Sequence, residues 1–305
     1  MKFLIIGGTG HVGTFLTQIL HEQGHDIYIG HRGTTKIPGD PVFSKVNYVT
    51  CDSWNLAEME ALSAREHFDV IVDFPGTIWN VWQAFKNNAD HIISCGSVWM
   101  FGNPKIVPTP ERNQGPCPFD IYEERNEAYS KIMAESRNTR AVFSAVMPPN
   151  ISGPGKTPLD TLGGRDEEVH RANMRGEKVY LPEGPEATIC PCDAYDLAML
   201  FALVANNRTA ADGQIFNGGT EHSLTATEYV NTFARIHGVE IPIEYVPWDV
   251  YKNEISPDIG YWWHFYAHMT PDITKAKTLL GYKPRYTSEE AMARGIAWMK
   301  ENGLL

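Results

Sequence analysis

The chain has 305 residues, 43% of them hydrophobic, and a formal net charge of −11 at pH 7. This length and composition support one large α/β domain or two joined ones. The negative charge disfavours nucleic acid or an anionic membrane as the main partner. Five cysteines in a chain of this size indicate a reduced, cytoplasmic protein rather than a disulfide framework. We expect neither a signal peptide nor a membrane-spanning segment.

The first 25 residues read as a strand, a glycine-rich turn and an amphipathic helix. An apolar run at 3–6 leads into Gly7-Gly8-Thr9-Gly10-His11-Val12-Gly13, after which apolar residues recur at helical spacing. Glycines at these positions permit a tight turn, close approach to a pyrophosphate and close helix–strand packing. The helix N-terminus then offers free N–H groups to phosphates. We therefore assign dinucleotide contacts to Gly7, Thr9, Gly10, His11, Val12 and Gly13.

Strands and helices alternate through the first half of the chain. Strands are expected at 25–29, 45–50, 69–73, 91–95 and 141–147, and helices at 55–65, 79–87 and 122–137. This alternation predicts an α/β fold with a Rossmann-type, doubly wound parallel sheet. A Pro- and Gly-rich stretch at 103–119 is expected to be a loop over the sheet edge.

Past residue 150 the alternation breaks, which predicts a smaller, interleaved C-terminal domain. Helices are expected at 166–175, 195–205, 226–237, 272–280 and 288–300, and strands at 178–181, 214–217 and 242–246. We predict a dinucleotide-binding domain of residues 1–165 plus about 190–220. The remainder of 166–305 is expected to bind the substrate.

The end of the second strand bears on which dinucleotide binds. Gly30 stands where NAD-binding proteins place an acidic residue on the ribose, and Arg32 follows closely. A small residue beside a guanidinium suits a 2′-phosphate, so NADP is favoured and NAD is left open. The alternative is that Arg32 is a solvated loop residue. Asp52 is a candidate for the adenine edge or, alternatively, a helix N-cap.

The chain resembles the extended short-chain dehydrogenase/reductases of the NAD(P)-dependent epimerase/dehydratase type. The motifs run in family order: GGTGHVG at 7–13, ISCGSVW at 93–99, YSKIMAE at 129–135, PPNISGPG at 148–155, IFNGG at 215–219 and DITKAKTLLGYKP at 272–284. The resemblance implies a Rossmann sheet with a smaller substrate domain. It also implies hydride transfer with a bound nicotinamide, mostly on nucleotide-linked sugars. We add Phe74 and Pro148 to the cofactor site.

The family's catalytic pattern of Ser/Thr and Tyr-x-x-x-Lys is incomplete here. Lys131 matches the family lysine, which holds the nicotinamide ribose, but Glu127 stands where the tyrosine should be. Tyr129 lies roughly 200° around the helix from Lys131, at about 100° per residue. Tyr122, which begins a Tyr-x-x-x-Asn, could reach the site only if the helix starts late or bends. Glu127 is therefore either a substitute general base or the surface partner of Lys131.

The family's serine and arginine positions also differ. Cys95 occupies the place of the catalytic hydroxyl, and Ser97 is the nearest substitute. Cys95 is otherwise a packing residue at a strand end. Met147 replaces the arginine that often opens the Pro-x-x-Ile-x-Gly-Pro motif, and no arginine occurs at 187–193. Both losses weaken the case for a nucleotide diphosphate on the substrate.

Three further patterns, a cysteine pair, a histidine pair and an aromatic run, are assigned no metal site. The spacing of Cys190 and Cys192 fits neither the usual zinc nor the thioredoxin-like patterns. His264 and His268 are four residues apart, without an apparent third ligand. The aromatic run 261–266 is core or interface, or else lines a pocket in which a sugar ring stacks.

The sequence thus supports two hypotheses of different classes. The first is an NAD(P)-dependent oxidoreductase or epimerase acting on a sugar-like alcohol or ketone. Its catalytic candidates are Lys131, Glu127, Tyr122, Ser97 and Cys95. The second is a non-catalytic NAD(P)-binding sensor. A small-molecule substrate is the expected partner, a homodimer is left open, and an RNA-binding relative is disfavoured by charge.

Overall fold

The computed structural model describes residues 1–34 and 37–305. Within these residues, seven parallel strands form one sheet in the order β11-β6-β5-β4-β1-β2-β3. Their bounds are β1 Lys2–Ile6, β2 Asp26–His31, β3 Asn47–Thr50, β4 Phe68–Asp73, β5 Ala89–Cys95, β6 Val142–Met147 and β11 Gln214–Asn217. This order, with β1 next to β4, confirms the doubly wound fold predicted from the alternation of strands and helices.

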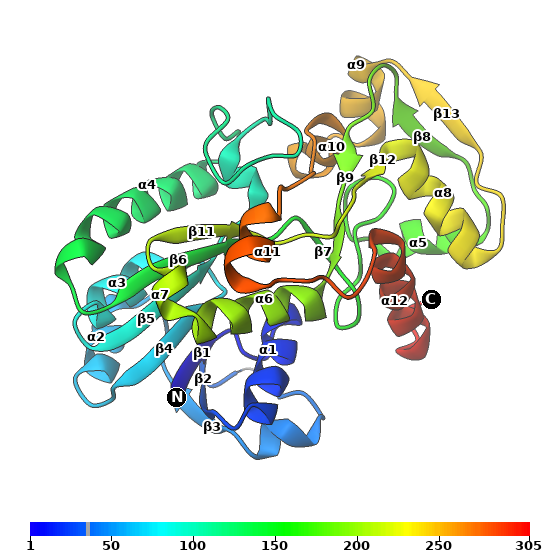
Figure 1. Cartoon of the computed structure of the whole chain (residues 1–305). Coiled ribbons are helices and arrows are strands. Elements are labelled where there is room, and N and C mark those ends of the chain that lie inside the picture. The colour runs from blue at the N-terminus through cyan, green and yellow to red at the C-terminus, as the bar shows by residue number, and fades with distance from the viewer. Residues whose placement is uncertain (35–36) are drawn as a thin grey trace.

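Helices cover both faces of the sheet, as Figure 1 shows. One face carries α1 (His11–Glu22), α6 (Ala194–Asn206), α7 (Arg208–Ala211) and α11 (Thr274–Leu280). The other carries α2 (Leu56–Ser63), α3 (Ile78–Phe85) and α4 (Asp120–Glu135). Because both faces are covered, the central strands are continuous apolar runs with almost no solvent exposure.

The strand register lines up the residues at the carboxyl edge of the sheet. Ile6 pairs with Gly30 on one side and with Asp73 on the other, and Asp73 pairs with Ser94. Ligands of doubly wound sheets bind outside this edge, where the strand order reverses. The expected cofactor residues therefore lie on the side of the molecule where this fold binds its ligand.

A smaller region with its own buried cluster lies beside this edge and occupies the upper right of Figure 1. Its helices are α5 (Glu167–Met174), α8 (Ala226–His237), α9 (Trp248–Val250), α10 (Ile259–Tyr266) and α12 (Ser288–Glu301). Three short strand pairs join them: β8 (Val179–Pro182) with β13 (Ile243–Val246), β9 (Thr188–Ile189) with β12 (Leu224–Thr225), and β7 (Asn150–Ser152) with β10 (Pro191–Asp193). The chain also makes short 3₁₀ turns at Pro41–Ser44, Val98–Phe101 and Ser136–Asn138, and a π-helical turn at Tyr251–Ile255.

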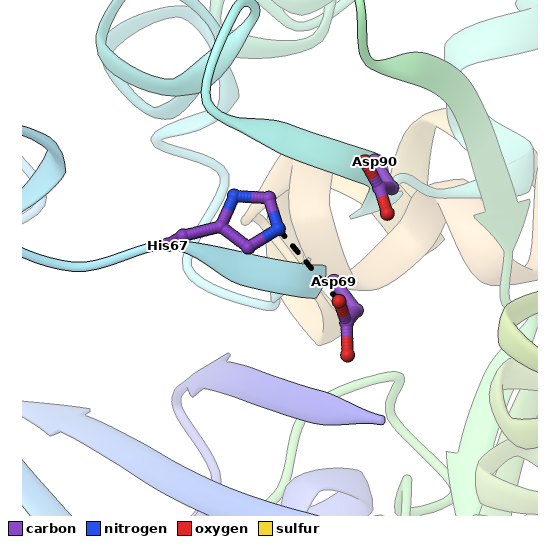
Figure 2. A group of neighbouring side chains, drawn as sticks. All are labelled: His67, Asp69 and Asp90. Carbon is purple, nitrogen blue, oxygen red and sulfur yellow. Dashed lines mark ion pairs between the residues drawn. The ribbon is translucent and has the colours of Figure 1, made fainter.

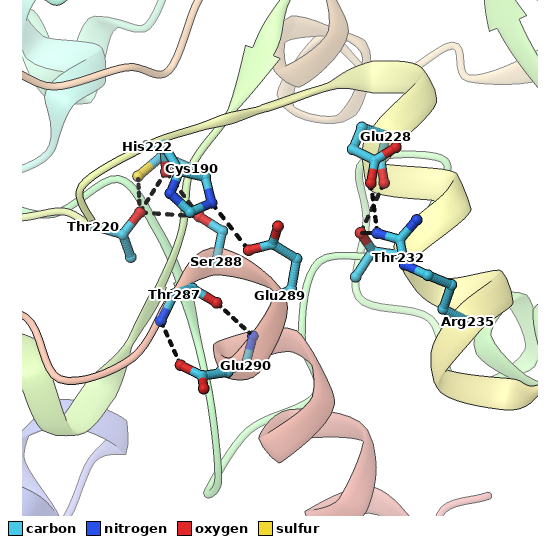
Figure 3. A network of polar contacts seen from close by, with 10 residues as sticks. All are labelled: Cys190, Thr220, His222, Glu228, Thr232, Arg235, Thr287, Ser288, Glu289 and Glu290. Atoms are coloured by element: carbon cyan, nitrogen blue, oxygen red, sulfur yellow. Dashed lines mark hydrogen bonds and ion pairs between the residues drawn. The ribbon is translucent and has the colours of Figure 1, made fainter.

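The start of α12 is tied to the loop that follows β11 (Figure 3). Thr287 and Glu290 form a reciprocal capping box at the first turn of the helix. Next to it, the Ser288 hydroxyl lies 3.0 Å from that of Thr220, which also contacts the Cys190 thiol at 3.6 Å. Cys190 is thus a packing residue of this junction.

Most of the expected elements are present within a few residues of their predicted ends. The short strands β7, β9, β10 and β12 were not expected. The proposed domain boundaries stay a prediction, although α11, from the expected substrate region, packs into the core beside α1 and α6. Among the described residues, no helix is both long and apolar enough to cross a bilayer.

Candidate active site

The glycine turn between β1 and α1 leaves no room for side chains. A Cβ on Gly13 would lie 2.1 Å from the carbonyl oxygen of Gly7, and Gly7 itself has φ +86°. The Gly10 N–H donates to the Gly7 carbonyl at 2.9 Å, which closes the turn. Gly10 caps α1 without a side chain, so the first N–H groups of the helix stay free for an anion. This geometry fits the pyrophosphate of a dinucleotide.

A cleft continues from this turn along the ends of β2 and β3. Its walls include Thr9, Gly30, Arg32, Cys51 and Trp54. The Arg32 side chain is exposed and lines the cleft beside Gly30, where a Cβ would lie 3.2 Å from Cys51 Sγ. Both residues therefore lie where a cofactor's adenosine end could meet them.

Asp52 and Phe74 support the walls of this cleft. Asp52 accepts a hydrogen bond from the Trp54 N–H at 3.1 Å. The alternative that Asp52 caps the next helix is wrong, because Asn55 caps α2. The Phe74 ring packs on Phe201, and its Cβ would lie 3.0 Å from a Cβ on Gly7. Phe74 thus lies against the glycine turn.

Ser97 and Tyr122 meet in a second pocket at the ends of β5 and β6. Pro148, His264 and Arg165 line the same pocket. Helix α4 starts at Asp120, two residues before its predicted start, and Tyr122 lines the pocket from the first turn. The expectation that Tyr122 reaches the site only if the helix starts late is therefore wrong. Burial raises the pKa of Tyr122, while the Ser97 hydroxyl and the Arg125 guanidinium act in the opposite direction. Tyr122 is therefore a neutral proton donor held next to a serine hydroxyl.

Arg125 lines a further cleft together with Trp54 of the cofactor cleft, and its Cζ lies 5.7 Å from the centre of the Tyr122 ring. Its guanidinium covers Gly76, where a Cβ would lie 1.9 Å from Nη2, and donates to the Cys95 carbonyl at 3.4 Å. Asp73 is fully buried at the end of β4. Burial raises the pKa of its carboxyl to about 6, although the positive charge of Arg125 acts to lower it. The position four residues after Tyr122 is occupied by Asn126, which donates to the Met100 carbonyl at 2.8 Å. The family's lysine position relative to Tyr122 thus holds a neutral amide, and the cation Arg125 precedes it by one residue.

Glu127 and Lys131 lie away from Ser97 and Tyr122. Their side chains are 72% and 61% exposed and pair with each other at 3.6 Å. The Lys131 ammonium also lies 6.0 Å from the centre of the Trp79 ring. This arrangement matches the surface ion pair that the sequence left open for Glu127. Their catalytic assignment stays a prediction.

Tyr129 and Cys95 are packed beneath the pocket. The Tyr129 hydroxyl donates to Ser94 Oγ at 2.8 Å, and burial raises its pKa far above the ordinary value. Burial also raises the pKa of the Cys95 thiol to about 12, so the thiolate is disfavoured. Of the two residues proposed for the hydroxyl role, only Ser97 lines the pocket in the described part of the chain.

The aromatic run forms α10 and contributes His264 to the pocket. His264 Nδ1 lies 2.8 Å from Asn150 Nδ2, and its ring lies 4.7 Å from that of Trp99. Burial lowers the pKa of His264 to about 3, with Arg165 adding to the effect. His268 instead faces Thr188 Oγ1 at 3.2 Å, so the two histidines have separate partners.

One group of side chains has metal-like spacing, shown in Figure 2. One ligand atom from each of His67, Asp69 and Asp90 lies within 4.8 Å of the others. These residues stand at the amino ends of β4 and β5, opposite the cofactor edge. Asp69 accepts from the Lys2 N–H at 2.6 Å and Asp90 from Arg140 Nε at 2.7 Å. Because protein donors already occupy these carboxylates, we assign no metal there.

Comparison with known proteins places this geometry in a family. A sequence profile of the NAD dependent epimerase/dehydratase family matches residues 3–219. The chain belongs to this family. It is 25% identical to the chloroplast stem-loop binding protein of 41 kDa b from Arabidopsis thaliana, over 95% of this chain and 77% of that one. It is 23% identical to a UDP-glucose 4-epimerase from Lactobacillus helveticus, over 99% and 98% of the two chains.

Solved structures of this family have the same fold. The UDP-glucose 4-epimerase of Thermotoga maritima, solved with UDP-glucose, superposes with a TM-score of 0.77 at 17% identity, covering 99% of each chain. The enzyme from Bifidobacterium longum, in complex with NAD⁺ and UDP, gives 0.74 at 18% identity over 100% and 99% of the chains. Family and fold thus agree with the sequence motifs.

Several pocket residues were missed by the sequence reasoning. Arg125 and Arg165 match no family motif in this chain. Asn150 lies within the quoted 148–155 motif, which was the available signal for it. His264 was considered only as a metal ligand or as part of an aromatic run. These four residues come close to Ser97 and Tyr122 only through the paths of loops, which a single sequence does not specify.

Proposed function

We propose that the protein is an NAD(P)-dependent oxidoreductase or epimerase acting on a sugar-like alcohol or ketone. The observation that carries the proposal is the meeting of Ser97 and Tyr122 in a pocket at the carboxyl ends of β5 and β6, the sheet edge at which the glycine turn also lies. The names of several relatives, UDP-glucose 4-epimerases, support sugar chemistry. NADP is the favoured cofactor because Gly30 carries no acidic side chain and Arg32 supplies a positive charge in the same cleft.

Each residue has a defined part in this proposal. The nicotinamide, when bound, supplies hydride-accepting and hydride-returning chemistry. In the reducing direction Tyr122 gives its phenolic proton to the carbonyl oxygen as the carbon gains hydride, which leaves a tyrosinate; in the oxidising direction that tyrosinate takes up the alcohol proton as hydride leaves the carbon. Ser97 orients that oxygen through its hydroxyl. Arg125 stays charged, favours the tyrosinate by its field and offers donors to ribose hydroxyls.

Replacement of Tyr122 tests this function. Tyr122→Phe removes the proton carrier but keeps the ring, so turnover should fall on the order of 10²–10⁴-fold with cofactor affinity nearly unchanged. Absorbance at 340 nm with NADP⁺ and a panel of sugar alcohols, sugar acids and nucleotide sugars measures the rate. Tyr129→Phe is the matched control, because its hydroxyl contacts only Ser94 among the described residues. Equal rates for Tyr122→Phe and the parent would overturn the proposal.

The non-catalytic sensor is the other reading of the same fold. Tight cofactor binding by the parent, without absorbance change on any compound of the panel, would favour it. The Arabidopsis relative is named for stem-loop binding. The net charge of −11 opposes contact with a phosphate backbone, so nucleic acid is not proposed as a partner. A cytoplasmic location and a homodimer stay predictions.

A further inference from the structure

Arg165 presents a guanidinium to the pocket of Ser97 and Tyr122. Its Nη1 donates to the Thr157 carbonyl at 2.5 Å and its Nη2 to the Ile151 carbonyl at 3.0 Å. These two bonds hold the planar group in place and leave other N–H donors of its five unused. The side chain is partly buried, so its orientation is fixed by the protein rather than by solvent.

The loop before Arg165 is itself braced. The Asp160 carboxylate accepts the N–H groups of Leu162, Gly164 and Asp166 at 2.7–3.0 Å. Gly163, with φ +88°, packs so closely on the Tyr261 carbonyl that a Cβ would lie 2.2 Å from its oxygen. The loop at 160–166 is thus held by its own hydrogen bonds and packing, and it fixes the point from which Arg165 reaches the pocket.

No carboxylate pairs with Arg165 among residues 1–34 and 37–305. Asp160 is near enough to raise its pKa, but the oxygens of that carboxylate already accept three backbone amides. Burial lowers the pKa of Arg165 all the same. A partly buried guanidinium without an ionic partner is costly unless a ligand supplies the opposite charge.

The neighbouring groups are neutral and polar. His264 accepts from Asn150 Nδ2 through Nδ1, which places its proton on Nε2 as a donor. Asn150 is 6% exposed, and its Oδ1 has no partner in the described structure. The pocket thus offers one fixed positive charge together with hydrogen-bonding groups suited to hydroxyls or a carbonyl.

The pocket is small, at about 190 Å³. Sites for larger ligands typically measure about 300–1,000 Å³. Met147 stands where the family often has an arginine, and residues 187–193 contain none. The charge that would bind a phosphate or carboxylate is therefore found beside the reacting groups.

We propose that the substrate is a compact sugar-like alcohol or ketone that carries its own anionic group, a carboxylate or a single phosphate, bound by Arg165. This inference rests on the proposed function and names its substrate class. The charged end of the substrate would meet Arg165. The carbon that exchanges hydride would face Ser97 and Tyr122.

Calorimetry on the NADP⁺-saturated protein tests the inference without requiring turnover. Glucose is compared with glucuronate, and separately with glucose 6-phosphate, so that the two arms distinguish carboxylate from phosphate. We expect at least one charged compound to bind ten-fold or more tightly than glucose. Arg165→Gln should remove that preference, Arg165→Lys should keep part of it, and cofactor affinity should change less than two-fold.

Arg171→Gln is the matched control, because this half-buried arginine of α5 pairs with Glu167 and Glu168 and does not line the pocket. It should leave the charge preference intact. Equal binding of charged and neutral sugars, tighter binding of UDP-glucose than of either anion, or loss of cofactor affinity in Arg165→Gln would each overturn the inference. If the protein prefers the charged sugars but never reduces NADP⁺, the inference about Arg165 stands and the proposed reaction is contradicted.

Discussion

At the residue scale, the two cations of α4 differ in their surroundings. Arg125 is partly buried between Gly76 and the Cys95 carbonyl, whereas Lys131 is 61% exposed and paired with Glu127. A charge in a partly buried site acts more strongly on its neighbours than one facing solvent. The position of Arg125 therefore favours it over Lys131 as the cation that assists Tyr122.

Paired substitutions on α4 decide between these cations. Arg125→Met should weaken NADP⁺ binding about ten-fold or more and lower turnover, because it removes donors beside the reacting end. If the exposed ion pair is their whole role, Lys131→Met and Glu127→Gln should change affinity and rate less than two-fold and stability by well under 1 kcal/mol. Calorimetry and the 340 nm assay measure both effects. Loss of binding in Lys131→Met alone would restore the family role predicted for that lysine.

Arg32 decides the cofactor preference at the other end of the cleft. Arg32→Ala should weaken NADP⁺ binding about ten-fold and leave NAD⁺ nearly unaffected, because a charge-assisted hydrogen bond contributes about 1.5–3 kcal/mol and this side chain is exposed. Lys45→Ala, an exposed cation just before β3, is the control. An unchanged ratio of the two affinities would show that Arg32 is the solvated loop residue of the alternative reading.

At the scale of elements, the glycine turn is the most constrained junction of the fold. Gly13→Ala would place a methyl carbon 2.1 Å from a backbone oxygen, so α1 must move away from β1. We expect a loss of about 2 kcal/mol or more and a large fall in cofactor affinity. Thermal unfolding and cofactor titration measure these changes. Gly39→Ala, where a Cβ meets nothing within 4 Å, should change neither, and equal behaviour of the two variants would contradict the account.

The sequence predicted this turn, the sheet and most helices because each depends on local patterns. Apolar runs set the strands, 3.6-residue spacing set the helices, and the glycines set the turn. The reaction pocket was predicted only in part. Ser97 and Tyr122 were named, but Arg125 and Arg165 reach the site through helix orientation and loop paths, which local spacing does not encode. Its helical phase excluded Tyr129 from the predicted catalytic pattern, and its hydroxyl donates to Ser94 Oγ beneath the pocket.

At the scale of the whole molecule, buried histidines link stability to pH. Burial lowers the pKa of His91 and His264 to about 3 and of His11 and His237 to about 4. Unfolding returns them to about 6.5, so the unfolded chain binds more protons below that pH and stability falls as pH falls. Asp73 opposes this, because its raised pKa of about 6 lets the folded state bind a proton first. Burial also raises the pKa of Asp193 and Asp196, which act with Asp73, and lowers that of His25 and His170, which act with the other histidines. With six histidines against three carboxyls, we expect net acid destabilisation.

His91 offers the cleanest measurement of this linkage, because it is fully buried in β5 and distant from the proposed site. Its Nε2 donates to Ser144 Oγ at 2.8 Å, since that hydroxyl donates onward to the Ala211 carbonyl. His91→Gln can keep this donor without titrating. Between pH 7 and pH 5 the parent should therefore lose up to about 2 kcal/mol more unfolding free energy than the variant, at about 1.4 kcal/mol per pKa unit below 6.5. Urea unfolding at both pH values measures the difference. An identical loss in the parent and in His91→Gln would mean that His91 takes up no extra proton on unfolding.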